Sequence, residues 1–145
     1  MKKLVLLTLL STLFLMAQTP FILTGVKKVY PMVEINTKEV PQSYKQDFFN
    51  KLTDTTKKLK IDTTGYSHRP LVIQITTHSV ADTLVYKIVL IMGEEMRRLD
   101  DGEEVFAITY QMSDEIEPDD LKEELYESVD FLLEQFSDQY VEDNQ

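Results

Sequence analysis

The sequence predicts an α+β fold with the order β-α-β-β-β-α, a four-stranded, mainly antiparallel sheet with two helices packed on one face. Three observations support this prediction. Apolar residues recur at steps of three and four after Pro41 and again after Pro118, as in amphipathic helices. Four other stretches are strand-like, three with apolar residues at every second position and one that is apolar on both faces. Two strand-like runs within 83–112 are joined by a turn sequence at 100–102.

Composition indicates one globular domain, which we place at 27–145. The chain has 145 residues, of which 43% are hydrophobic and 28% charged, so it is long enough for one core and too short for two comfortable domains. It contains no cysteine, which excludes disulfides, thiolate metal sites and cysteine nucleophiles.

The N-terminus has the pattern of an export signal. Lys2 and Lys3 precede an apolar run at 4–17 that is short for a bilayer core of about 30 Å, which predicts a signal peptide at 1–17. A second interpretation stays open, because a largely apolar stretch at 4–26 is long enough to be a retained membrane anchor. Both interpretations predict a periplasmic or otherwise exported domain, and the second adds a tether to the inner membrane.

The first strand and first helix follow in order. Val29, Pro31, Val33 and Ile35 alternate with more polar residues, and Pro31 favours a position at or near the sheet edge. We expect Pro41 to open a helix that is rich in lysine. Its apolar stripe comprises Tyr44, Phe48, Leu52, Thr55, Thr56 and Leu59.

Two runs follow that predict the second and third strands. Leu71, Ile73 and Ile75 share one face of the second, and His78 to Asp82 form a turn. The third, at 84–92, is apolar on both faces and is predicted to be central, with Gly93 marking a bulge.

A fourth strand completes the hairpin. Phe106, Ile108, Tyr110 and Met112 are expected to share one face. Pairing Leu99 with Glu103 gives a single register that joins apolar residues and opposite charges across the hairpin. That register pairs Met96 with Phe106, Met92 with Tyr110, Leu90 with Met112, and Arg98 with Glu104.

The last helix is expected to open at Pro118, with Asp119 and Asp120 in its first turn, where acidic side chains interact favourably with the helix dipole. Its buried stripe is formed by six residues, and the tail at 142–145 is polar. The stripe comprises Leu121, Leu125, Val129, Leu132, Phe136 and Tyr140.

No residue is predicted to be catalytic, cofactor-binding or metal-ligating. His68 and His78 are expected at opposite ends of the second strand, about 30 Å apart, which is too far for a shared metal. Acidic residues cluster at 100–104 and 114–120 without the spacing of a calcium-binding loop. We therefore interpret 100–104 as a solvated turn and expect no cofactor.

The charge distribution argues against nucleic acid as a partner. Residues 1–93 contain 12 Lys and Arg against 6 Asp and Glu, whereas residues 94–145 contain 3 against 19. The acidic C-terminal part would repel a phosphate backbone. It is expected to be a solvated helix face, or else to meet a basic partner or a divalent cation.

The export signal, the order of elements, the turn at 100–102 and a closing helix that ends LLEQFSDQYVEDN together suggest a family resemblance. This organisation resembles small envelope proteins of Gram-negative bacteria, such as the lipopolysaccharide-assembly lipoprotein and the auxiliary lipoproteins of ABC transporters. The chain departs from them in having no cysteine after the signal to carry a lipid. The resemblance implies a non-catalytic adaptor or scaffold.

The predicted function is therefore a non-enzymatic periplasmic module that binds another envelope protein or a lipid component. Two alternatives stay open. One is a carrier that holds a small apolar ligand or lipid between the sheet and the helices. The other is a hydrolase that uses carboxylates.

Overall fold

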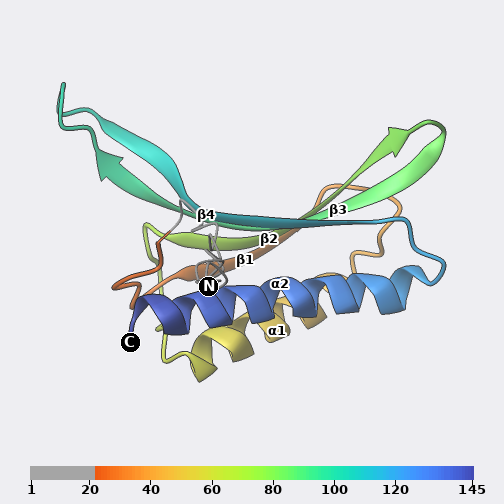
Figure 1. Cartoon of the computed structure of the whole chain (residues 1–145), viewed down its shortest axis with the longest axis horizontal. Helices are drawn as coiled ribbons and strands as arrows, with labels where there is room; N and C mark the ends of the chain where they lie inside the picture. The colour runs from red at the N-terminus through yellow and green to blue at the C-terminus, as the bar shows by residue number, and fades with distance from the viewer. Residues whose placement is uncertain (1–21) are drawn as a thin grey trace, which may run out of the picture.

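The computed structural model describes residues 22–145, and the elements follow the predicted order. They are β1 (Tyr30–Ile35), α1 (Tyr44–Lys58), β2 (Pro70–Val80), β3 (Thr83–Arg97), β4 (Glu104–Ile116) and α2 (Leu121–Asp143). Figure 1 shows one sheet with both helices on the same face, while the ends of the β2–β3 and β3–β4 hairpins bend away from the helices. The α+β fold class is confirmed.

The sheet is mixed, with the strand order β1-β2-β3-β4. β1 and β2 are parallel, and the other two pairings are antiparallel. The parallel pair follows from α1, because a chain that leaves β1 through a helix on one face returns in the same direction. β3 is central, as its apolar residues on both faces predicted.

The core lies between the sheet and the two helices. Alternate residues of each strand point toward the helices, and helical residues at steps of three and four meet them. The buried residues include Val33, Ile35, Leu71, Ile73, Ile75, Ile88, Leu90, Met92 and Tyr110 from the strands, and Phe48, Leu52, Leu125, Val129, Leu132 and Phe136 from the helices. The apolar stripes predicted for both helices therefore form the core.

Both helices begin later than the prolines predicted. Pro41 belongs to a turn in which the Tyr44 amide donates to the Pro41 carbonyl, and α1 starts at Tyr44. α2 starts after Asp120, whose carboxylate accepts hydrogen bonds from the amides of Lys122 and Glu123. A side-chain acceptor at this position satisfies amides that have no partner within the helix, so Asp120 sets the start of α2.

The segment before β1 is packed against the end of α2. Leu23 and Val26 belong to the core. The Leu23 amide donates to the Asp143 carboxylate at 2.6 Å, and the Tyr140 hydroxyl donates to the Val26 carbonyl at 3.0 Å. The packed structure thus includes residues upstream of Lys27.

The predicted signal at 1–17 lies outside the described residues. The alternative anchor at 4–26 lies mostly outside them. Within 22–145, neither helix combines the length and apolar character needed to cross a bilayer.

The β3–β4 pairing contains a bulge that divides it into two registers. Met92 pairs with Tyr110 as predicted, but Gly93 pairs with Ile108, which leaves Thr109 as an extra residue in β4. Gly93 was predicted to mark a bulge, and this is confirmed. The single predicted register holds between Tyr86 and Met92 and is wrong beyond them.

Candidate functional site

The part of the hairpin beyond the bulge forms a projecting arm, Gly93–Ile108. The antiparallel pairing of β2 with β3 reaches only Leu71 opposite Met92, so within residues 22–145 the arm is a two-stranded ribbon. Figure 1 shows this ribbon extending past the end of the helices and away from them. The arm is thus built from the sheet but lies outside its packed body.

The bulge places the apolar residues of the arm in solvent. One extra residue reverses which side chains face the helices, because strand side chains alternate with a period of two. Tyr110 is buried, while Phe106 and Ile108 are 60% and 50% exposed. The prediction that Phe106 and Ile108 share the core face of Tyr110 is therefore wrong, and the bulge at Thr109 is the reason.

Four large apolar side chains are exposed along the arm. Phe106 and Ile108 lie on one face of the ribbon, and Met96, 47% exposed, lies on the other. Leu99 is fully exposed in the loop at the tip. Several large apolar side chains gathered on one protruding element are a feature of interaction sites, whereas single exposed apolar residues are common anywhere.

Gly93 allows the Phe106 ring to lie flat on the ribbon. A Cβ atom added at Gly93 would lie 2.4 Å from Cζ and 2.5 Å from Cε1 of Phe106. The ring therefore covers the space that a side chain at this position would take. This contact fixes the orientation of one of the four apolar side chains, which reduces the entropy lost when a partner covers it.

The root of the arm is fixed by two polar contacts to the segment before β2. The Arg69 guanidinium donates two hydrogen bonds to one Glu94 carboxylate oxygen, the one from Nε at 2.9 Å. His68 Nδ1 lies 3.0 Å from a Glu95 carboxylate oxygen. Glu94 and Glu95 therefore have their partners in the segment before β2 and not among the arginines of their own strand.

A hollow of about 400 Å³ lies beside the root and is open to solvent. Several of its lining side chains contact one another, namely Arg69 with Glu94, His68 with Glu95 and Tyr66 with His68. The lining residues are Lys28, Tyr66, Ser67, His68, Arg69, Glu94 and Glu95. A second hollow, of about 350 Å³, lies between α1 and α2. Neither lies between the sheet and the helices, where the predicted apolar-ligand carrier would need its cavity.

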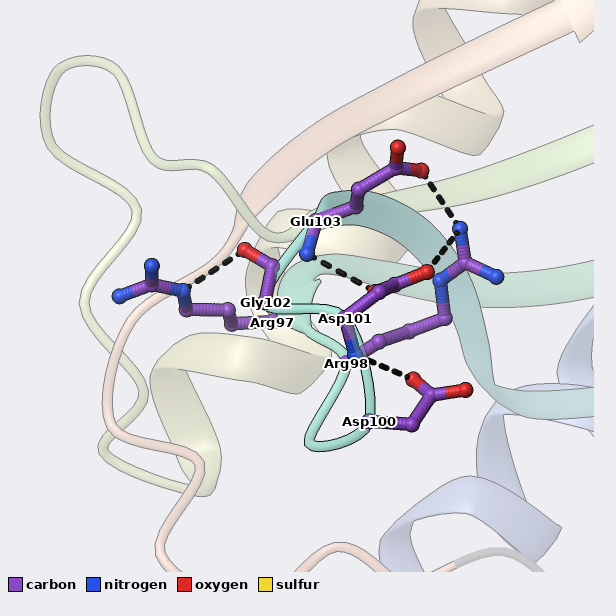
Figure 2. A network of polar contacts seen from close by, with 6 residues as sticks. All are labelled: Arg97, Arg98, Asp100, Asp101, Gly102 and Glu103. Atoms are coloured by element: carbon purple, nitrogen blue, oxygen red, sulfur yellow. Dashed lines mark hydrogen bonds and ion pairs between the residues drawn. The ribbon is translucent and has the colours of Figure 1, made fainter.

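The tip of the arm is held by its own polar network, shown in Figure 2. Arg98 forms ion pairs with Asp101 and Glu103, and Arg97 donates to the Gly102 carbonyl at 2.8 Å. Gly102 has a φ of +71°, a conformation that glycine adopts without a steric penalty. These contacts support the predicted turn at 100–104 and hold Leu99 at its outer end.

The ion pair predicted between Arg98 and Glu104 is wrong. Beyond the bulge the register shifts by one, so Glu104 lies opposite Arg97. Arg98 instead reaches acidic residues within the loop. The loop carboxylates are thus occupied by hydrogen bonds and ion pairs that shape the turn.

The arm is strongly acidic as well as apolar. Between residues 93 and 108 it carries six Asp and Glu side chains against two Arg. Such a surface attracts a basic partner and repels both anionic lipid and a second copy of itself. Chemically, the arrangement is suited to contact an apolar surface rimmed by positive charge.

The described residues contain no group of three or more His, Asp or Glu side chains placed to hold a metal ion. His68 lies at the root of the arm, and His78 lies within β2 opposite Val85. The two predicted acidic clusters are likewise separate, one at the arm tip and the other spanning the end of β4 and the start of α2.

No protein-family model matches the chain, and no curated protein matches its sequence. Among solved structures, the crystal structure of a minor lipoprotein from Acinetobacter baumannii is similar, with 12% sequence identity and a TM-score of 0.40. The match covers 81% of this chain and 92% of that chain.

Proposed function

We propose that this protein is a non-catalytic, exported module of the bacterial cell envelope that binds another protein through its β3–β4 arm. The observation that carries the proposal is the exposure of Met96, Leu99, Phe106 and Ile108 on an arm that is fixed at both root and tip. None of the four is needed to fill the core. Contact of these apolar side chains with water is unfavourable in free energy. A partner surface that covered them would remove this cost.

Burial of the exposed apolar side chains of the arm would favour binding. Removing one large apolar side chain from water contributes about 1.5–3 kcal/mol when burial is complete. A few such residues dominate the affinity of most protein interfaces. Leu99 and Phe106 are the strongest candidates, because one is fully exposed and the other is held in place against Gly93.

The partner is proposed to present an apolar pocket with basic side chains around it. The six acidic residues of the arm surround its apolar side chains in sequence, so a basic rim would be attracted from a distance while the pocket receives Leu99 or Phe106. A lipid component was an alternative partner, and the acidic arm disfavours an anionic membrane surface.

Export is proposed from the sequence of 1–17. The packing of Leu23 and Val26 restricts how far a retained membrane anchor could extend. A membrane anchor that extended to Val26 would remove both residues from the core. A retained anchor would therefore have to end before Leu23. Cleavage after Ala17 would leave a short segment, 18–22, in front of the packed domain.

The experiment compares envelope proteins captured by the wild-type domain and by arm variants. Leu99→Asp and Phe106→Asp are expected to lose a specific partner, since each places a charge where the partner surface is apolar. Val80→Asp is the matched control, because Val80 is 52% exposed at the other end of the sheet. A partner that both arm variants retain, or that Val80→Asp also loses, would refute the role of the arm.

A further inference from the structure

The outer edge of β4 is a second surface with the features of an interaction site. β4 is the last strand in the order β1-β2-β3-β4, so no strand of residues 22–145 pairs with its outer side. In an antiparallel pair, alternate residues direct their N–H and C=O groups away from the neighbour. These outward groups can accept a further strand from another chain.

The edge lacks two of the usual features that prevent such pairing. β4 contains no lysine and no proline between Glu104 and Ile116, and proline follows only at Pro118. The bulge at Thr109 interrupts its regular geometry, which leaves Tyr110–Ile116 as an unbroken stretch of seven residues in the body of the sheet. At about 3.3 Å per residue, this stretch matches an added strand of ordinary length.

The surroundings of this edge indicate the charge of the added strand. From Glu104 to Gln145 the chain carries 14 Asp and Glu side chains, and Lys122 is its single basic residue. Asp114 lies on the edge strand itself, where Glu115 already pairs with Lys87. Glu123 lies in the first turn of α2, where the Glu124 carboxylate accepts hydrogen bonds from the Asp119 and Asp120 amides. A second copy of β4 would bring these acidic residues against their own kind, whereas a basic strand would neutralise them.

α2, which packs on β4, also carries an exposed apolar side chain, that of Phe131. This helix packs on β3 and β4, and α1 packs on β1. Asp130 faces α1, where it pairs with Lys51. The next residue, Phe131, therefore points to a different side of α2, the flank that does not face α1, and it is 47% exposed.

We infer that Tyr110–Ile116 accepts an extended basic polypeptide segment as a fifth strand of the sheet. Backbone hydrogen bonds to β4 would supply the pairing, and the acidic side chains of β4 and α2 would select for Lys and Arg in the segment. The site is separate from the exposed apolar residues of the arm. A basic segment can therefore bind at β4 even if the arm has no partner.

The test uses the mature protein and a synthetic peptide of about eight residues that alternates lysine with valine, a length set by the strand rise. A second peptide of the same sequence carries N-methyl groups on every other residue, so that one edge has no N–H donors. The expected result is that methylation weakens binding at least about tenfold, or about 1.4 kcal/mol. Amide hydrogen exchange is expected to slow within Tyr110–Ile116 when the unmethylated peptide binds.

Variants that remove acidic charge measure how much the acidic side chains contribute to peptide binding. Asp114→Asn with Glu123→Gln is expected to weaken binding about three- to tenfold and to reduce its dependence on salt. Asp54→Asn, on the exposed side of α1, is the matched control and is expected to change neither. Leu99→Asp is expected to bind the peptide normally, which distinguishes this site from the arm.

Three results would overturn the inference. The first is equal binding of the methylated and unmethylated peptides, which would show charge attraction without strand pairing. The second is protection from exchange at β1 or at the arm in place of Tyr110–Ile116. The third is no measurable binding at low salt, where attraction between opposite charges is strongest.

Discussion

Replacing Gly93 by alanine should test the architecture of the arm. A Cβ at this position would lie 2.4 Å from Cζ of Phe106 and 3.0 Å from the carbonyl oxygen of Ala107. Both distances are too short unless the neighbouring atom moves. The Phe106 ring can swing away because it is 60% exposed, whereas the Ala107 backbone can give little.

The cost can be worked from the buried part of the ring. Phenylalanine buries roughly 200 Å² when fully covered, so a ring that is 60% exposed buries about 80 Å² here. At about 25 cal/mol per Å², displacing it loses about 2 kcal/mol. Alanine recovers about 0.5–1 kcal/mol relative to glycine in a strand, because it loses less backbone entropy on folding. The net destabilisation of the arm should be about 1–1.5 kcal/mol.

The assay is amide hydrogen exchange of the arm residues, because the arm can open locally while the core stays folded. A double-mutant cycle with Phe106→Ala isolates the contact. In that background Gly93→Ala should cost less than in the wild type, because only the contact with the Ala107 carbonyl remains, which gives a coupling free energy of about 1–2 kcal/mol. An equal effect of Gly93→Ala in both backgrounds would refute the contact between Gly93 and Phe106.

Three further predictions concern the root of the arm, the core and the N-terminal segment. Glu94→Gln should speed amide exchange at the arm root, because Arg69 loses a charged acceptor and the free energy of local opening falls by about 1–2 kcal/mol. Exchange rates equal to those of the wild type would contradict this. Burial raises the pKa of Tyr110 to about 12, so stability in urea should fall as the pH rises from about 10, where an unfolded tyrosine ionises, to about 12. Tyr110→Phe should make the free energy of unfolding depend less on pH in this range. An unchanged pH dependence would contradict the role given to Tyr110. Asp143→Ala should lower the free energy of unfolding by about 1 kcal/mol, since the Leu23 amide loses its acceptor, and Glu142→Ala serves as the control.

The sheet body could be predicted from sequence because its signals are local and consistent. Alternating apolar residues identify the strands, and pairing Met92 with Tyr110 follows from matching apolar with apolar. The parallel pairing of β1 and β2 depends on the path through α1. Strand alternation alone does not report the direction in which a strand runs.

The exposure of the arm could not be predicted, because alternation continues through the bulge. Phe106, Ile108 and Tyr110 are spaced two apart, as they would be on one face of a regular strand. Gly93 signalled a bulge, but the sequence does not state that the extra residue is Thr109 on the opposite strand. Applying a one-residue shift after Gly93 would have turned Phe106 and Ile108 to the opposite face.

The polar contacts at the arm root depend on tertiary structure. Arg69 and Glu94 are separated by 25 residues and belong to different segments. Either could pair with many other charges in the sequence. Their pairing follows only once β2 and β3 lie side by side.

The most direct test of arm-mediated binding is site-specific photo-crosslinking in intact cells. A photoreactive residue at Leu99 or Ile108 should give a discrete crosslinked product with one envelope protein, and Phe106→Asp should abolish it. A photoreactive residue at Asn50, which is exposed on α1, should give no such product. Absence of a product at both arm positions, or the same product from Asn50, would contradict the proposal that this protein binds its partner through the arm.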